Sequence, residues 1–471
     1  MKNFILNIGS ESGETLSRDT LYGAWCKGKK VGFVEYPPLA LLSINTFLNK
    51  NGFETYFLDA QGQKISNPVL VDKYDWTKFD TLITQTSTMT FRSDLKLLSG
   101  IKERNPKIKF IVCGSHVTFM PEHSSKNNVI DYMVQYEPEE TTLKLLNKIK
   151  NDDKKIPRFS GVQGEYISIE ELPIVDRTPI LNINYYNPLV KEERWTTMET
   201  TRGCPSRCTF CTAPDFFGKK IRKRAVEDII NEMKYLKKLG YKEIAFRDEI
   251  FTYHKKRTME VCQRMIDEKL NMKWICNGKI GMVDKEAMKI MKRAGCHLLL
   301  FGVESGNQRV LDAIKKDQTI EQIEDTFRWA KEVGIDTHAH FLIGNPGETE
   351  AEIEDTIAFA KKIKPTTVAF GILTIYPGTQ LHRDTKENLP KDWDGTEAEI
   401  TNLHIKSYQN SAFTELSPET IEKYVMKAYR EFYTRPSYIF KRIFSISSIH
   451  DVFTLGKSGL GVFNMILTKE N

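Results

Sequence analysis

The 471-residue sequence lacks long apolar runs and has no strong excess of charge of either sign. No stretch reaches the ~18 uninterrupted apolar residues of a membrane span, so we expect no transmembrane segment. The 68 basic and 62 acidic residues leave a net charge of +6, which for this length does not indicate nucleic-acid binding. The opening "MKNFILNIGS" lacks the apolar core and cleavage site of a signal peptide. We therefore expect a cytoplasmic protein.

Cysteine is scarce too, with eight residues in the whole chain. So few thiols in a chain of this length do not resemble a secreted disulfide scaffold. In a reducing cytoplasm, clustered thiols instead indicate a metal site or catalysis. Five of the eight are scattered, and we interpret them as small core residues. They are Cys26, Cys113, Cys262, Cys276 and Cys296.

Residues 1–150 alternate strand-like and helix-like segments. Apolar residues with helical spacing at 39–52 and 93–104 lie between strand candidates. This alternation predicts a Rossmann-like domain with a parallel sheet, whose ligand loops lie at the carboxyl ends of the strands. The strand candidates are residues 3–9, 55–60, 80–87, 109–116 and 130–137.

A second α/β series begins at Trp195, after a segment at 151–194 that we interpret as a linker. Six strand candidates, the first five each followed by a helical run, predict a partial (β/α)6 barrel over 195–390. Capping boxes at Thr319 and Thr349 begin two of its helices. The strand candidates are residues 195–201, 243–251, 273–278, 297–306, 336–344 and 367–378.

Two regions rich in basic residues have less certain roles. The run "KKIRKR" at 219–224 is interpreted as the solvated start of a helix, and a binding patch for an anionic substrate or an electron donor is the alternative. Residues 391–471 are predicted to form a helical extension in which aromatic, apolar and basic residues mix. This composition leaves open a cap on the barrel, the wall of a substrate channel or contact with a membrane surface.

The three remaining cysteines lie together in "ETTRGCPSRCTFC", with the spacing C-x3-C-x2-C. Cys204, Cys208 and Cys211 follow the first predicted barrel strand, at the end where such barrels carry their chemistry. Cysteine thiolates hold iron–sulfur clusters, whereas a structural zinc site needs a closed set of four ligands. A four-iron cubane on three cysteines keeps one iron open to a small molecule. Three unrelated thiols are the alternative, which their placement within eight residues disfavours.

This loop resembles the signature of the radical SAM enzymes. The resemblance implies that Cys204, Cys208 and Cys211 hold a [4Fe–4S] cluster whose open iron chelates S-adenosylmethionine. An electron from the reduced cluster would then cleave the sulfonium to a 5′-deoxyadenosyl radical, which abstracts hydrogen from an unactivated carbon.

Motifs at the later strands follow the same family's order. By this resemblance, Asp248 or Glu249 in "FRDEIF" accepts hydrogen bonds from the amino group of S-adenosylmethionine. Glu304 and Ser305 in "GVESG" meet its carboxylate or ribose, and Gly344 in "FLIGNPGET" lies beside its adenine.

The front domain resembles the cobalamin-binding domain of class B radical SAM proteins. "VCGSHVTFMPE" is similar to their "GG-x-H-x-T…P-E" loop, and "YMVQYEPEET" to their "GE-x-E" turn. The resemblance implies a cobalamin site at the strand ends, and the candidate residues are Gln85, Thr86, Ser115, His116 and Glu137.

Two departures from that family pattern affect the cobalamin prediction. The D-x-H-x-x-G motif that supplies a histidine to cobalt is absent, which implies that His116 need not be a ligand. Ser115 and Tyr136 also replace glycines that allow a flat corrin close to the backbone. Class B proteins with the domain but without cobalamin are therefore an alternative.

Together these resemblances imply cobalamin-dependent methylation of an unactivated carbon. Radical cyclisation, rearrangement or oxidation without methyl transfer is the alternative reaction. A cluster-bearing scaffold or redox sensor is the non-enzymatic alternative. The expected partners are a small-molecule or lipid-like substrate and a flavodoxin- or ferredoxin-type electron donor. The expected location is the cytoplasm, and attachment to the membrane periphery stays open.

Overall fold

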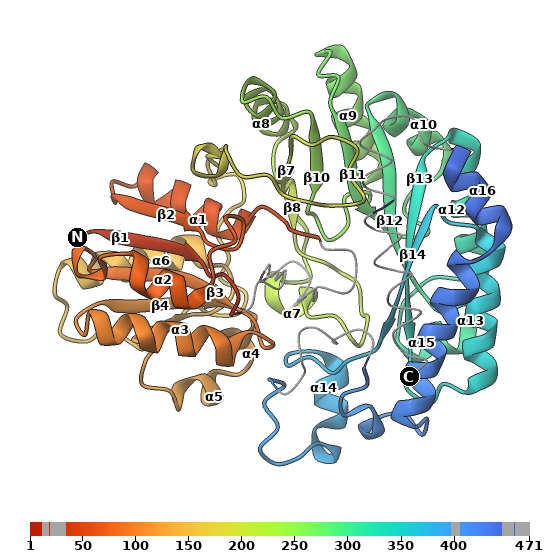
Figure 1. Ribbon diagram of the computed structural model, residues 1–471. Helices are drawn as coiled ribbons and strands as arrows, with labels where there is room; N and C mark the ends of the chain where they lie inside the picture. The colour runs from red at the N-terminus through yellow and green to blue at the C-terminus, as the bar shows by residue number, and fades with distance from the viewer. Residues whose placement is uncertain (12–17, 19–33, 397–405, 445–455, 457–471) are drawn as a thin grey trace.

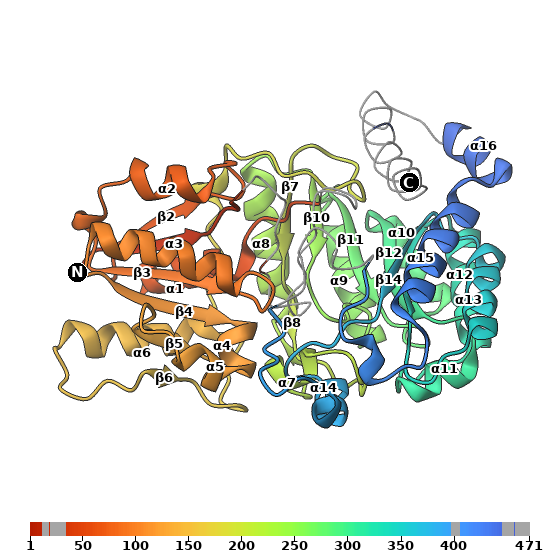
Figure 2. The same ribbon diagram turned by 60° about the horizontal axis from the view of Figure 1, so that its bottom comes forward.

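The computed structural model describes residues 1–11, 18, 34–396, 406–444 and 456. Two parallel sheets with flanking helices lie side by side, and α7 (Ala213–Phe217) and the short strand β8 (Thr201–Arg202) lie between them (Figure 1, Figure 2). Within the described part of the chain, no helix is long and apolar enough to cross a membrane.

The front sheet has the strand order β2-β1-β3-β4-β5-β6, and all its pairs are parallel. Its five predicted strands are confirmed, but β6 was missed because it lies within the segment interpreted as a linker. The strands are β1 (Asn3–Asn7), β2 (Thr55–Asp59), β3 (Thr81–Thr86), β4 (Lys109–Gly114), β5 (Tyr132–Val134) and β6 (Phe159–Ser160).

Both faces of the front sheet are covered by helices, as its nearly continuous apolar strands require. Ile5, Ile83 and Ile111 pack against α1 (Leu39–Lys50) and α6 (Pro138–Lys150). On the other face, alternate residues of the same strands pack against α2 (Asn67–Lys73) and α3 (Phe91–Arg104). After β4, the predicted loop in "VCGSHVTFMPE" instead contains α4 (Ser115–Phe119) and the start of α5 (Pro121–Ser125).

The second sheet has the order β14-β13-β12-β11-β10-β7, and all six strands are parallel. This confirms the six predicted barrel strands. They are β7 (Trp195–Met198), β10 (Glu243–Phe246), β11 (Lys273–Gly278), β12 (Cys296–Glu304), β13 (Asp336–Ile343) and β14 (Thr367–Ile372).

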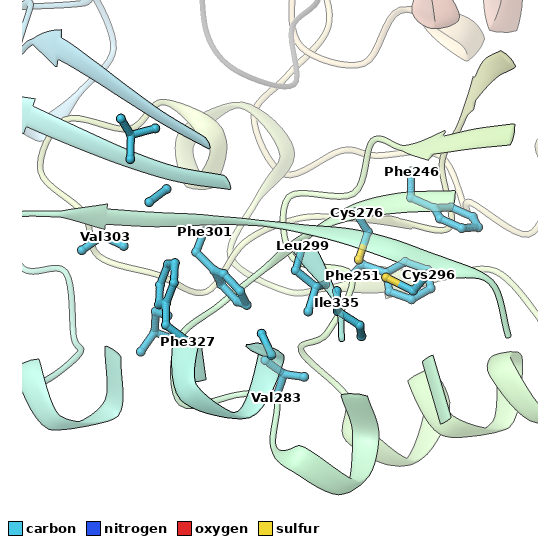
Figure 3. Packing of buried hydrophobic residues seen from close by; sticks show 14 of the residues in the cluster. Phe246, Phe251, Cys276, Val283, Cys296, Leu299, Phe301, Val303, Phe327 and Ile335 are labelled. Carbon is cyan, nitrogen blue, oxygen red and sulfur yellow. The ribbon is translucent and has the colours of Figure 1, made fainter. Parts of the chain in front are cut away.

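Helices cover the outer face of the barrel sheet. Phe246, Cys276, Cys296 and Phe301 belong to the core between the sheet and these helices (Figure 3), so both cysteines are core residues as predicted. The capping boxes at α12 and α13 are confirmed. The covering helices are α8 (Val226–Lys238), α9 (Lys255–Asp267), α10 (Lys285–Arg293), α11 (Gln308–Ala313), α12 (Ile320–Val333) and α13 (Glu350–Ile363).

The helix α15 (Pro418–Tyr433) of the extension packs along the edge strand of the barrel, and Trp393, Ala412 and Phe413 share a cluster with Phe210 of the cysteine loop. After α14 (Gln380–Thr385), the helix α15 lies along β14 (Figure 1). Tyr429 Oη accepts a hydrogen bond from the Phe370 amide at 3.1 Å. The helix α16 (Pro436–Phe444) follows. Most of the predicted extension beyond it, and Cys26, lie outside the described residues.

The segment at 151–194 packs against both sheets. Ile180, Tyr185 and Val190 share one buried cluster with Leu42 of α1 and with inward-facing barrel residues such as Trp195. This cluster fills the space between α1 and the start of the barrel strands.

Candidate functional site

A two-stranded clamp closes the loop that carries the three cysteines. β8 pairs antiparallel with β9 (Arg222–Lys223), so the chain leaves and re-enters at one place. Between these strands, Gly203 has φ +107°, and a Cβ there would lie 2.3 Å from the carbonyl oxygen of Lys220. Only glycine fits this approach. The Cys204 amide then donates to the Gly218 carbonyl at 3.0 Å, which fixes the start of the loop.

The three thiols lie close enough together for the charge of one to raise the pKa of another. Cys204 is buried, and Cys208 and Cys211 are half-buried. Burial raises the pKa of each thiol, and in Cys211 the other two add to this effect. Among the described residues, no three His, Cys, Asp or Glu side chains converge on a single metal ion. Three thiolates on a cubane cluster each bind a different iron, so they need not converge on one point.

Asp248, at the end of β10, holds the strand that enters the cysteine loop. It accepts hydrogen bonds from the Thr200 amide at 2.5 Å and the Thr201 amide at 3.1 Å. Its second oxygen accepts from the Thr200 hydroxyl. Burial raises the pKa of Asp248, and these hydrogen bonds oppose the rise. Asp248 therefore fixes the backbone before the cysteines.

Glu249 differs from its neighbour, because neither oxygen of its buried carboxylate has a hydrogen-bond partner among the described residues. Burial raises its pKa well above the usual range, and Glu199 raises it further. The carboxylate lies near enough to Cys204 for its charge to raise the pKa of that thiol. A buried polar group without partners is rare and costly, by roughly 1–3 kcal/mol. The carboxylate of Glu249 can therefore accept hydrogen bonds from an amino group beside the cysteines.

Glu304 ends β12, and Ser305 follows it in a different environment. Glu304 has φ +68°, and its carboxylate forms an ion pair with Lys316 at 2.6 Å. The charge of Glu304 raises the pKa of Cys208 and that of Lys316 lowers it, so this pair lies beside the cysteine loop. The Ser305 hydroxyl lies 3.0 Å from that of Thr356 in α13 and accepts from the Asn307 amide. Ser305 thus joins β12 to the outer helices.

Gly344 begins the loop after β13. With φ +80°, it lies beneath Ile421 of α15. Its amide donates to Glu348 at 2.7 Å, and the Asn345 amide donates to the same oxygen. Burial raises the pKa of Glu348 to about 7, and the hydrogen bonds to it oppose the rise. This carboxylate holds the loop in shape, a role that the sequence did not suggest.

The candidate cobalamin residues lie together at the carboxyl ends of the front strands. The His116 ring is buried, with Nδ1 3.3 Å from the Thr88 hydroxyl and Nε2 2.9 Å from Nδ1 of His123. Burial lowers the pKa of His116 to about 3, so the ring stays neutral. The Thr86 hydroxyl donates to Asp94 at 2.8 Å. Gln85 and Ser115 are also buried at this edge.

Glu137 forms ion pairs with two arginines of the barrel domain. Arg222 binds both of its oxygens, one of them at 2.9 Å. Arg202, the residue before Gly203, pairs with Glu137 at 3.3 Å and with Glu139 at 2.7 Å. The interpretation of 219–224 as a solvated helix start is therefore wrong. Arg222 belongs to β9, and its ion pairs join the cysteine loop to the front domain.

Comparisons with known proteins agree with this architecture. Residues 198–360 match the family model of the Radical SAM superfamily, and residues 30–146 match that of the B12 binding domain. An uncharacterized methyltransferase of Pyrococcus horikoshii is 31% identical over 384 residues, which cover 78% of this chain and 82% of that protein.

Two further relatives extend the comparison. The anaerobic magnesium-protoporphyrin IX monomethyl ester cyclase of Rubrivivax gelatinosus is 26% identical, over 74% of this chain and 66% of that protein. The structure of the radical S-adenosylmethionine methyltransferase TsrM from Kitasatospora setae, with cobalamin and a [4Fe–4S] cluster bound, has a TM-score of 0.69. Its identity is 13%, and the superposition covers 100% of both chains.

The fold, the cysteine loop and these matches define the class of protein: the chain belongs to the radical SAM superfamily. Within this superfamily, it is a radical SAM enzyme with a B12 binding domain in front of the radical SAM domain. The predicted fold class is thereby confirmed.

Proposed function

We propose that this enzyme cleaves S-adenosylmethionine reductively at a [4Fe–4S] cluster and methylates an unactivated carbon with the help of cobalamin. The observation that carries the proposal is the buried, unpartnered carboxylate of Glu249 beside the cysteine loop. It supports binding of an amino group, as hydrogen-bond donor, next to a cluster held by Cys204, Cys208 and Cys211. The methyltransferase name of the Pyrococcus relative favours methyl transfer.

In this proposal, each residue of the barrel site has a separate task. The three cysteines hold the cluster, and Glu249 accepts hydrogen bonds from the amino group of S-adenosylmethionine. Asp248 keeps the Thr200–Thr201 backbone in place, so it supports the loop rather than the ligand. A cluster held by these cysteines would supply the electron for reductive cleavage of S-adenosylmethionine.

Cobalamin, which supplies the transferred methyl group, would lie at the carboxyl edge of the front sheet. Gln85, Ser115 and the backbone after β4 would contact it. His116 would not bind cobalt, since both of its ring nitrogens already face protein partners. S-adenosylmethionine would then serve twice, as radical source and as methyl donor to the corrin.

Radical ring closure without methyl transfer is the second candidate function. The observation in its favour is the likeness to the Rubrivivax cyclase, which covers 74% of this chain. For either reaction we propose a small-molecule or lipid-like substrate and a flavodoxin- or ferredoxin-type electron donor. We also propose a cytoplasmic enzyme, and α16, with exposed Phe440 and Phe444, offers a face for contact with the membrane periphery.

The test begins with anaerobic reconstitution of the full chain with iron, sulfide and hydroxocobalamin. We expect bound cluster, bound corrin and 5′-deoxyadenosine formation on reduction. Glu249→Gln should keep its iron but form 5′-deoxyadenosine about 10- to 100-fold more slowly, the loss of a hydrogen bond to a charged group. Glu260→Gln, at an exposed position in α9, is the matched control and should behave as the wild type.

Two results would contradict the proposal. If Glu249→Gln and Glu260→Gln cleave S-adenosylmethionine equally fast, then Glu249 does not bind the ligand. If the reconstituted protein binds no corrin but still cleaves S-adenosylmethionine, then cobalamin-dependent methylation fails and ring closure becomes the leading function. S-adenosylmethionine with a labelled methyl group distinguishes the two reactions directly once a substrate is found.

A further inference from the structure

A tight turn after α11 is hydrogen-bonded to the cysteine loop. The Thr209 amide donates to the Ile314 carbonyl at 3.1 Å. Two residues of this turn, Lys315 and Asp317, have positive φ angles of 53° and 52°. Such backbone conformations are uncommon outside glycine and cluster at functional sites. They fix the direction of the residue between them, Lys316.

Lys316 points inward to a buried ion pair. Its ammonium lies 2.6 Å from the Glu304 carboxylate, and the side chains are only 15% and 7% exposed. The pair packs directly over Gly302 of β12, where a Cβ would lie 2.2 Å from Glu304 Oε1 and 2.6 Å from Lys316 Nζ. The bulge in the pairing of β12 and β13 falls at the same place. The end of β12, Gly302 and the turn after α11 therefore all accommodate the Glu304–Lys316 pair.

The ammonium of Lys316 lies beside the cysteine loop. It is 5.7 Å from the ring centroid of Phe210, the residue before Cys211. Its positive charge lowers the pKa of both Cys208 and Cys211. Lys279 is the other lysine whose charge acts on Cys208, and its ammonium is held 2.9 Å from the Ser206 hydroxyl.

We propose that Lys316 is a positioning residue for electron transfer, whose buried positive charge sets the reduction potential of the cluster. This inference depends on the proposed function, because it needs a cluster at Cys204, Cys208 and Cys211. The motifs found in the sequence do not include this lysine.

The physical argument is a balance of charge. Reduction adds one electron and takes the cubane from [4Fe–4S]2+ to [4Fe–4S]1+, with no bond made or broken. The electron comes from a low-potential one-electron donor of the flavodoxin or ferredoxin type. The three thiolates are negative in both states, so the reduced form carries one more negative charge in a buried site. A fixed ammonium nearby stabilises that form, and low local polarity strengthens the effect. Glu304 opposes it.

The experiment is a redox titration of the reconstituted full chain, monitored by electron paramagnetic resonance without S-adenosylmethionine. Lys316→Met should lower the equilibrium constant for reduction at least tenfold, which is about 59 mV for one electron. Lys316→Arg, which keeps the charge, should titrate close to the wild type. Lys315→Met is the matched control, since Lys315 is exposed and carries the same charge one residue away.

Glu304→Gln provides a test of sign. Removing the carboxylate leaves the charge of Lys316 uncompensated, so the equilibrium constant for reduction should rise. A merely structural role would shift both variants in one direction or neither of them. If Lys316→Met loses its iron, the reduction potential of Glu304→Gln relative to that of the wild type still tests the inference.

Unchanged potentials in Lys316→Met and Glu304→Gln, with iron retained, would overturn the inference. A loss of affinity for S-adenosylmethionine without a shift in potential would also overturn it, because Lys316 would then serve the ligand. Failure of the wild type to bind iron would instead contradict the proposed function, so the two failures are distinguishable.

Discussion

Two buried carboxylates at the carboxyl edges of the two sheets, those of Glu137 and Glu249, have opposite surroundings. At the front edge, Glu137 is bound by Arg202 and Arg222, and His116 is enclosed by Thr88 and His123. At the barrel edge, the buried carboxylate oxygens of Glu249 have no partner among the described residues. These front-edge side chains thus already have protein partners. The barrel edge keeps a side chain whose partner must come from outside.

The largest expected effect is at the barrel edge. Replacing Cys204, Cys208 or Cys211 with alanine should abolish stable binding of iron and sulfide, because three ligands are the fewest that hold such a cubane here. Cys262→Ala is the matched control, since this thiol is buried in the outer core. Iron and sulfide analysis after anaerobic reconstitution makes the comparison. Equal iron in the loop variants and the control would contradict the assignment.

The next effect concerns the satisfied front edge. Arg202→Met leaves Glu137, Glu139 and Glu199 without this buried cation, and we expect a loss of about 3–5 kcal/mol in the free energy of unfolding. Arg104→Met breaks an exposed pair with Asp72 and should change far less. Urea denaturation of both variants measures the difference. Similar losses in both would mean that the ion-pair network does not join the domains.

Glu348 is a barrel-edge acid that the backbone already satisfies, so its effect should depend on pH. Its pKa is about 7 in the folded protein, above the ordinary value of 4.5. The folded state therefore binds the proton more tightly. Its contribution to stability is present below pH ~4.5 and lost as pH rises to ~7, a change on the order of 3 kcal/mol. Glu348→Gln should flatten this decline in urea titrations at several pH values. An unchanged slope would refute the assignment.

The smallest effect is expected at His116. Because both ring nitrogens have protein partners, His116→Ala should leave the amount of bound cobalamin and its absorption spectrum unchanged. The free energy of unfolding should fall by only about 1–3 kcal/mol, because Thr88 and His123 would lose their hydrogen-bond partner. Cobalamin content and visible spectra of reconstituted protein test this prediction. A spectral shift would identify His116 as a cobalt ligand after all.

Local patterns were enough to predict most of the fold. Apolar periodicity located all six barrel strands, and the capping boxes at Thr319 and Thr349 form as expected. The strand β6 escaped detection because Phe159–Ser160 is too short to show alternation and depends on its neighbour β5. Such a strand exists through tertiary pairing rather than through its own residues.

The site was harder to predict, because it depends on contacts between distant residues. The sequence placed Asp248 and Glu249 together but could not tell them apart, since the distinction depends on Thr200, 48 positions earlier. It misread Arg222, whose partner Glu137 lies 85 positions away. Lys316 had no motif at all, although the unusual backbone of its neighbours is visible in the structure.

The central claim is that the cysteine loop and Glu249 form one site for S-adenosylmethionine. Pulsed electron–nuclear double resonance of the reduced protein, with nitrogen-15 in the amino group of the ligand, tests it most directly. The account predicts a strong nitrogen coupling to the cluster in the wild type, weakened in Glu249→Gln. A wild-type protein with full iron content and bound ligand but no nitrogen coupling would contradict it.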